Sequence, residues 1–431
     1  MRTPSLFTIF LTVFIDLVGF GIVVPLVPVY SRHLGASGFV IGVIIASFSA
    51  MQFLFSPFWG RLSDRIGRRP VLLVSTAGAV VSYVLFALGS GLENHTAALV
   101  WLVVSRVLAG ICGGNIVVAQ AYIADISPPE QRSRRMGLIG MAFGLGFIFG
   151  PIIGGLSLHY LGQTGPGWVA ASLCALNFVL AFTILVESWK PSSQHAAGRP
   201  RLAQWAHTLG QPKVGLLIAV FFLATFCFSC FETTLPLVVS DNFHLDITRD
   251  ERAATTVTYL YAFCGIIGAL VQGGMIGRLV KRMGEPKVIA LSLVLTGISL
   301  APIPFVHGDS QLSWGRLFSA GGGAWWALLG PLALLSIGSS LTRPPLFGLL
   351  SILTPAHEQG ATIGVAQSAG SLARILGPIY AATLFGRSAA LPYLTCAVIA
   401  LGTGLVIWQK LRGVPNAADP TPPTATPANV A

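Results

Sequence analysis

The sequence predicts an all-α membrane protein with twelve transmembrane helices in two six-helix bundles, and composition, apolar stretches and an internal repeat predict it. Of the 431 residues, 54% are hydrophobic and 10% are charged, against about 25% charged in soluble domains. The mean hydropathy is +0.76. So few charges could not cover the surface of a soluble protein of this size. The composition therefore excludes a soluble enzyme, a disordered chain and a secreted disulfide scaffold.

Twelve stretches reach the roughly 20 mostly apolar residues that a spanning helix needs. In the first half they are 6–30, 38–59, 70–90, 97–122, 136–156 and 167–187. In the second half they are 214–238, 254–276, 287–306, 325–347, 361–384 and 390–409. The first stretch is too long for a cleaved signal peptide and is expected to remain as a helix.

The polar breaks between these stretches predict the domain organisation. We expect an N-terminal bundle over 1–187, a cytoplasmic linker over 188–213 and a C-terminal bundle over 214–411. Residues 412–431 are rich in Pro, Ala and Thr and are expected to form a disordered cytoplasmic tail.

The distribution of Lys and Arg predicts the orientation. With the N-terminus inside, 18 of the 26 basic residues lie on the inner side, five lie outside and three (Arg106, Arg343 and Arg374) lie within spans. Basic loops between spans favour the cytoplasm. We therefore expect a multi-pass protein of the cell membrane, or of the inner membrane in a Gram-negative cell, with both termini cytoplasmic. Basic cytoplasmic loops beside the lipid bilayer then account for the net charge of +11, and no nucleic-acid partner is expected.

The two halves repeat each other. The sequence GRLSDRIG at 60–67 follows span two, and GRLVKRMG at 277–284 follows span eight. A Gly-Pro pair occurs at 150–151 in span five and again at 377–378 in span eleven. Two like-oriented bundles with a site between them near the bilayer midplane are typical of a transporter.

Two segments rich in glycine have a direct physical interpretation. In GRLSDRIGRR at 60–69, the glycines permit a tight turn and the arginines favour the anionic inner leaflet. In GFIFGPIIGG at 146–155, Gly146, Gly150 and Gly154 recur every four residues and form a flat face for close helix packing. Pro151 can kink that helix.

Charges inside the predicted spans are candidate site residues because a charge there is costly and needs a partner. Asp16 lies about 15 Å from the inner end of span one, and Arg106 lies about 14 Å from the outer end of span four, at 1.5 Å per residue. The two reach similar depths and could form a pair that exchanges proton and substrate. A fixed structural ion pair, or an arginine capped by carbonyls, is the alternative.

Four segments carry a family resemblance: 14–28 in span one, 60–69, 102–110 in span four and 146–155. They resemble motifs of the major facilitator superfamily, and within it of the twelve-helix drug:proton antiporters of the tetracycline-efflux type. The resemblance implies proton coupling at Arg106, although Ala109 stands where Gln is common. Asp16 matches the acidic residue of the first helix in these exporters. The resemblance also implies a gating motif (Gly60, Asp64, Arg65, Gly67 and Arg68) and an antiporter motif (Gly146, Gly150, Pro151, Gly154 and Gly155).

The resemblance implies a gating role for Asp64, which is expected to sit where span eleven begins. A carboxylate there would favour the positive end of that helix dipole and lock the halves together at the cytoplasmic side. The alternative is a charge that only sets topology. Four further residues are candidates for proton coupling or substrate binding, with helix packing and interhelical hydrogen bonds as their alternative roles: Glu232, Arg374, Asn115 and Gln120.

These features predict a monomeric secondary transporter that exports small molecules, tetracycline-like or otherwise amphipathic, against inward proton flow. Neither a cofactor nor a metal is expected, and the chain has no nucleotide-binding loop. Proton-coupled uptake of a sugar or organic anion is the alternative on the same fold, and a receptor or scaffold is an alternative of another class. A membrane-embedded enzyme is disfavoured because His357-Glu358 lacks the second histidine of a zinc motif.

Overall fold

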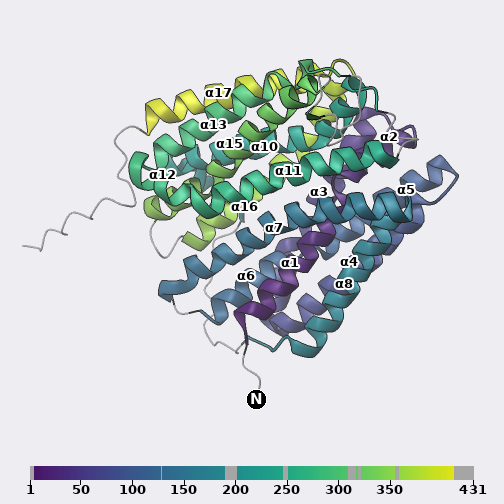
Figure 1. Ribbon diagram of the computed structural model, residues 1–431. Helices are drawn as coiled ribbons and strands as arrows, with labels where there is room; N and C mark the ends of the chain where they lie inside the picture. The colour runs from purple at the N-terminus through teal and green to yellow at the C-terminus, as the bar shows by residue number, and fades with distance from the viewer. Residues whose placement is uncertain are drawn as a thin grey trace, which may run out of the picture.

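The computed structural model of the chain describes residues 4–127, 129–189, 201–245, 251–308, 317–318, 322–354 and 359–411. Figure 1 shows two groups of helices side by side, the first half of the chain below and the second half above. The helices of the first half are α1 (Leu6–Val23), α2 (Leu26–His33), α3 (Gly38–Ile66), α4 (Arg68–Ser90), α5 (His95–Cys112), α6 (Asn115–Asp125), α7 (Pro129–Leu161) and α8 (Gly165–Ile184).

A short helix, α9 (Arg201–Gly210), lies in the predicted linker. The elements of the second half are α10 (Pro212–Asn242), α11 (Glu251–Gly274), α12 (Ile276–Met283), α13 (Glu285–Leu300), the 3-10 turn η1 (Ile303–Phe305), α15 (Gly323–Leu353), α16 (Gln359–Phe385) and α17 (Ala390–Lys410). The predicted linker is therefore not wholly irregular. Residues 190–200 of the linker and the tail 412–431 lie outside the described residues, so the domain boundaries stay predictions.

Two spans that the sequence predicts as continuous are each broken into two helices. In span one, α1 ends at Val23 and α2 begins at Leu26. Pro25 lies at the junction, and because proline has no backbone N–H it cannot continue the helical hydrogen bonds. Span four breaks between α5 and α6 at Gly113-Gly114. A side chain at Gly114 would meet the Trp59 ring, so close contact with α3 requires glycine at this break.

Eleven of the described spans are long and apolar enough to cross a membrane, with α1–α2 and α5–α6 each counted as one. Besides the short helices α9 and α12, α16 is outside this set; it is 27 residues long and carries Gln367, Ser371 and Arg374 along its length. It packs against α3 and α10. Its polar residues lower its hydropathy, but its length and packing make it the twelfth helix of two six-helix bundles.

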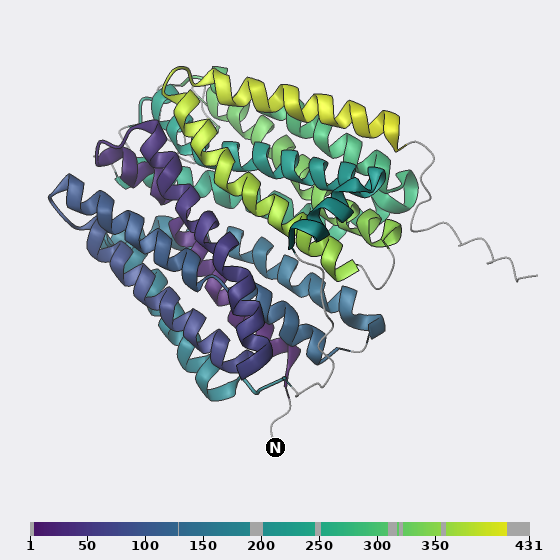
Figure 2. The same ribbon diagram turned by 180° about the vertical axis from the view of Figure 1, so that it is seen from behind.

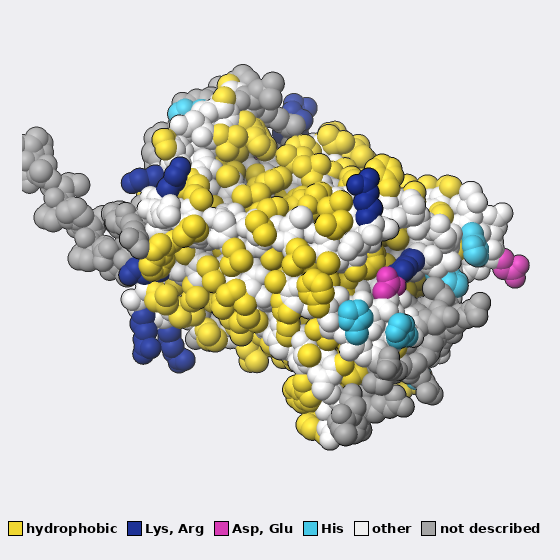
Figure 3. Space-filling model, turned by 90° about the horizontal axis from the view of Figure 1, so that it is seen from above, with side chains coloured by type: hydrophobic (Ala, Val, Ile, Leu, Met, Phe, Trp, Pro, Cys, Tyr) yellow, Lys and Arg dark blue, Asp and Glu magenta, His cyan; other side chains and the backbone are white. Residues whose placement is uncertain are grey.

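The surface is apolar along most of the face in Figure 3, and its charged side chains lie mainly toward the two ends, with several Lys and Arg side chains at one end and acidic and most His side chains at the other, where Lys or Arg also occur. Following the predicted topology, we call the end that holds Gly60–Arg69 the inner end and the opposite end the outer end. Charges at both ends of an apolar band are what a spanning protein requires.

The two halves meet along the pairs α3·α16 and α7·α11; Figure 2 shows α16 beside the first half from behind. At the outer end of α3, Gly38 adjoins the Ala382 carbonyl and Gly42 adjoins the backbone at Pro378 and Ile379. The outer ends of α2 and α10 are joined by an ion pair, with Arg32 Nη2 2.7 Å from Asp241 Oδ1. The described structure is therefore closed between the halves at the outer end.

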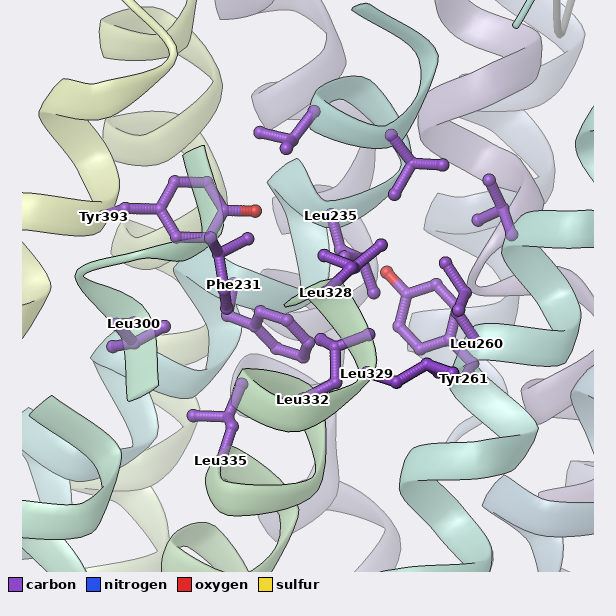
Figure 4. Close-up of a cluster of buried hydrophobic side chains, with 14 of the residues drawn as sticks. Phe231, Leu235, Leu260, Tyr261, Leu300, Leu328, Leu329, Leu332, Leu335 and Tyr393 are labelled. Atoms are coloured by element: carbon purple, nitrogen blue, oxygen red, sulfur yellow. The ribbon is translucent and has the colours of Figure 1, made fainter. Parts of the chain in front are cut away.

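Each bundle has its own apolar core. In the second half, α10, α11, α13, α15 and α17 bring together a cluster around Phe231 and Leu332. Figure 4 shows the Phe231 ring directed toward leucines of α15, with Tyr261 on the opposite side of that group. The Tyr261 hydroxyl donates to the backbone carbonyl of Glu232. This core fixes the rotation of α10 and therefore the direction of the Glu232 side chain.

Candidate functional site

The Asp16 carboxylate is enclosed within the first bundle and held by two amides. Its side chain comes from the middle of α1 and is 6% exposed. Asn115 Nδ2 donates to Oδ2 at 2.5 Å, and Asn177 Nδ2 donates to Oδ1 at 2.8 Å. The Cys174 thiol lies 4.0 Å from the same Oδ1. Asp16 thus contacts α6 and α8 inside its own bundle.

Asn177 of α8 belongs to this site, and one of its side-chain atoms has no hydrogen-bond partner. Its amide nitrogen also donates to the Thr12 carbonyl at 2.9 Å, while its Oδ1 is buried without a hydrogen-bond partner. An acceptor left unpaired in the core is costly. This oxygen can accept a hydrogen bond from a protonated carboxyl if the amide reorients, so the site can hold Asp16 in either charge state.

Arg106 of α5 lies over two aromatic rings. It is 2% exposed, with its guanidinium carbon 5.9 Å from the Tyr83 ring centroid and 5.7 Å from that of Phe86. Its Nε and Nη2 are buried without hydrogen-bond partners. The faces of aromatic rings attract a cation but accept no conventional hydrogen bond from it. Arg106 is therefore stabilised by aromatic contact and left with unused donors.

The expected ion pair between Asp16 and Arg106 is not formed, and this part of the prediction is wrong for the described structure. Ion pairs within 4.0 Å in the described part of the chain do not include either residue. Asp16 is held by Asn115 and Asn177 instead, and Arg106 packs against the Tyr83 ring. This ring lies under Arg106 and also against α1, where a Cβ at Gly19 would be 3.3 Å from its Cε2. Similar depth along two helices therefore did not mean contact.

A second group of charges lies in the C-terminal bundle. Glu232 on α10 and Arg374 on α16 are partly buried and lie within electrostatic reach of each other, although they form no ion pair within 4.0 Å among the described residues. Arg374 donates to Ser371 Oγ at 3.1 Å. Arg343 on α15 is also within electrostatic reach of Arg374. The two predicted residues are thus brought together, and Arg343 joins them.

The predicted gating motif forms a charge network at the inner end. Arg68 donates to Asp64 Oδ1 at 2.5 Å, to Ser63 Oγ at 2.7 Å and to Asp125 Oδ2 at 3.0 Å. Asp64 is 59% exposed, and within the described residues it bonds only to Arg68. Residues 355–358, which precede α16, lie outside the described part of the chain. The contact between Asp64 and span eleven therefore stays a prediction.

Gly67 is required by the turn that starts α4. Its φ of 100° favours glycine, and a Cβ there would lie 2.6 Å from Glu187 Oε2. The Glu187 carboxylate accepts the backbone N–H groups of Arg68 at 2.9 Å and Arg69 at 3.0 Å. A carboxylate at the start of a helix satisfies its free N–H groups and favours its dipole. The segment that follows α8 thus caps α4.

The antiporter motif is the packing face that its four-residue period predicts. A Cβ at Gly146 would lie 2.9 Å from the Leu17 backbone, one at Gly150 would lie 2.6 Å from Gly21 Cα, and one at Gly154 would lie 2.8 Å from the Ile22 carbonyl oxygen. The three glycines therefore let α7 contact the backbone of α1. Gly155 faces the other way, toward Thr258 of α11. The motif packs one helix against both its own bundle and the other half.

Pro151 does not break α7, which runs through it as a single helix. The remaining motif residues have smaller roles in the described structure. An added Cβ at Gly60 would make only an ordinary van der Waals contact, 3.6 Å from Val117 Cγ1. Arg65 lies exposed in the last turn of α3. Gln120 lies on α6 below Asn115 and makes no hydrogen bond within the described residues.

Sequence reasoning did not find Asn177, Asp125 or Glu187. A lone Asn in an apolar span was the available signal for Asn177. Asp125 and Glu187 stand at the inner ends of their spans, where an acid among basic loops is unexpected. Each of these residues acts on a partner more than 50 residues away.

The chain is similar to known proteins along nearly its whole length. A model of the Major Facilitator Superfamily matches residues 9–378 and 275–430. The tetracycline resistance protein, class E, of Escherichia coli is 32% identical over 384 residues, covering 87% of this chain and 86% of that protein. The quinolone resistance protein NorA of Staphylococcus aureus is 27% identical over 409 residues, covering 94% and 96%. A solved D-xylose–proton symporter is alike in fold, with a TM-score of 0.71, 17% identity and coverage of 94% and 97%.

Proposed function

The chain belongs to the major facilitator superfamily, and from this premise we propose that it exports amphipathic small molecules in exchange for protons by alternating access. The observation that carries the proposal is end-to-end similarity to two resistance proteins, one for tetracycline and one for quinolones, with similar coverage on both sides. The fold alone does not choose between export and uptake. The glycine face of α7 favours export, because it is the segment that resembles the antiporter motif.

The geometry supports a role for Asp16 of the N-terminal bundle in proton coupling. Asp16 is closed off from direct contact with a substrate and has amide partners suited to either charge state, so its role in the proposal is to carry the proton. Gly21 lies five residues beyond Asp16 on α1 and packs against Gly150. A change in the bonds of Asp16 therefore acts on the same helix that α7 contacts, and α7 in turn contacts the other half.

The proposed orientation places both termini in the cytoplasm. In that orientation the end closed between the halves faces outside, and substrate enters from the cytoplasm. The proton gradient then drives release, because protons are more concentrated on the outside. In the proposal the chain acts as a monomer, in which each half has its own apolar core.

The test is drug-induced proton movement. Purified protein in proteoliposomes with an imposed pH gradient is given a tetracycline, a fluoroquinolone or ethidium in turn. We expect at least one compound to release protons across the membrane at a rate that depends on its concentration and disappears in protein-free liposomes. A protein that moves none of them, or moves them without protons, does not have the proposed function.

At the inner end, Asp64→Asn is expected to slow transport several-fold while leaving folding intact. Asp64 is 59% exposed, so solvent screens its pair with the buried Arg68 and the pair contributes about 0–1 kcal/mol to stability, while Arg68 keeps its bond to Asp125. The loss should thus fall on the state in which the inner ends of the halves meet. Transport is measured at equal membrane abundance, with Glu93→Gln on the exposed outer loop as control. Equal rates for Asp64→Asn and wild type would show that Asp64 only sets topology.

A further inference from the structure

Arg343 lies in the middle of a span and has no acidic partner among the described residues. It stands ten residues before the end of α15 at Leu353, about 15 Å along the helix at 1.5 Å per residue. The three ion pairs of the described residues do not include it. An uncompensated cation at such depth is costly and marks a site. The mechanism proposed above does not use this charge.

Two adjoining aromatic rings lie against the guanidinium. Its carbon lies 5.8 Å from the ring centroid of Phe221 on α10 and 5.7 Å from that of Phe347, one turn further along α15. The two rings meet edge to face, with centroids 5.1 Å apart and planes at 80°. Arginine stacks on aromatic faces while its N–H groups stay free in the plane of the guanidinium. The rings therefore orient Arg343 without using its donors.

Most of those donors are available to a ligand. An arginine has five N–H groups, and the hydrogen bond found here is a long one of 3.5 Å from Nη2 to Gln367 Oε1 on α16. The side chain is exposed although the residue is in mid-helix. It leans toward α10 and α16, and α16 is the helix that packs on α3 of the other half. The free donors thus lie on the part of the C-terminal bundle that adjoins the first half.

The surrounding charges favour an anion. Arg374 adds a second positive charge, and Glu232 supplies the one acid within electrostatic reach of Arg374. The group is therefore net positive. Gln367 lies eight residues into α16 and Phe221 nine residues into α10, so both stand about 12–14 Å from the inner ends, near the level of Arg343. A guanidinium packed against a pair of aromatic rings matches a planar oxyanion attached to an aromatic system.

We propose that Arg343, oriented by Phe221 and Phe347, is the anion subsite of the transporter and binds substrates whose aromatic or conjugated ring carries a carboxylate or an acidic enol. The inference rests on the proposed function and deepens it by naming the substrate class. Arg343 is the specificity-determining residue, and Gln367 positions it. Neutral and purely cationic substrates do not use this subsite.

A matched pair of probes tests the subsite: a fluoroquinolone carboxylic acid and the ethyl ester of the same molecule. Binding to purified protein in detergent is measured by equilibrium dialysis without a proton gradient, so it does not depend on coupling. We expect wild type to prefer the acid, and Arg343→Gln to weaken acid binding by about tenfold or more while changing ester binding less than about twofold, because one charge-assisted pair is lost. Arg343→Lys should keep part of the preference.

The matched control is Arg387→Gln, the same change at an exposed arginine between α16 and α17, which should leave both affinities unchanged. Equal loss of acid and ester in Arg343→Gln, an unchanged acid affinity, or a wild type that binds the ester as well as the acid or binds neither would each overturn the subsite. Failure of the function is seen separately, as an absence of drug-induced proton movement. A wild type that prefers the acid but moves no protons would keep the subsite and reject the exporter.

Discussion

Asp16→Asn abolishes proton-driven export while the protein still folds and inserts in the membrane: this is the largest effect that we expect from a single polar substitution. An amide cannot gain or lose the proton, so the cycle loses the group that links proton entry to the movement of α1. The fold should survive because Asn115 and Asn177 remain near the new side chain. Asn177 Oδ1, which has no partner, can accept a hydrogen bond from the new amide.

The measurement is proton movement induced by drug in proteoliposomes with an imposed pH gradient, at matched protein content. Glu93→Gln makes the same kind of change on an exposed outer carboxylate and should behave as wild type. Substrate binding without a gradient should be retained in Asp16→Asn, which separates lost coupling from lost binding. Coupling like that of wild type in Asp16→Asn would remove Asp16 from the mechanism and direct the same experiment to Glu232→Gln.

Gly150→Leu should stop transport and also lower the thermal stability of the protein. An added Cβ would lie 2.6 Å from Gly21 Cα and 2.9 Å from the Ile22 nitrogen. These are backbone atoms of α1, which cannot move aside as a flexible side chain can. Overpacking a core typically costs about 1–3 kcal/mol, and here the larger side chain must separate two helices. We therefore expect loss of both rate and stability.

The same helix provides the control. Gly140 of α7 has nothing within 4 Å of an added Cβ, so Gly140→Leu makes the same substitution on an open face. Transport at equal membrane abundance and thermal unfolding in detergent are compared for both variants. Gly140→Leu should remain close to wild type in each. If the two variants behave alike, the backbone contact between α1 and α7 is not what the glycine motif provides.

The fold followed from local properties of the sequence. Apolar length and charge scarcity predicted the spans, and the repeat of GRLSDRIG by GRLVKRMG predicted two halves. The four-residue period of Gly146, Gly150 and Gly154 predicted a packing face because small residues at that spacing share one side of a helix. The structure places that face on α1. The breaks in spans one and four were less visible, since a proline or glycine in a membrane helix does not always interrupt it.

The site could be predicted only as far as the type of residue. The free-energy cost of placing a charge inside the bilayer singled out Asp16, Arg106, Glu232 and Arg374, whatever the direction of their side chains. That cost does not identify the partner of each charge. Depth along two helices suggested that Asp16 and Arg106 meet, but depth gives one coordinate of three. The rotation of each helix decides the contact, and it turns Arg106 toward the Tyr83 ring, which also lies against α1.

By itself, the sequence determined the class of protein, the number of its spans, its two halves and the glycine face, since each depends on residues close together in the chain. The tertiary structure alone decided that Asp16 binds Asn115 and Asn177, and that Arg343 packs against the adjoining rings of Phe221 and Phe347. The Asp16 partners lie 99 and 161 residues away in sequence. Contacts at such separation depend on how whole helices pack and rotate, which no local pattern specifies.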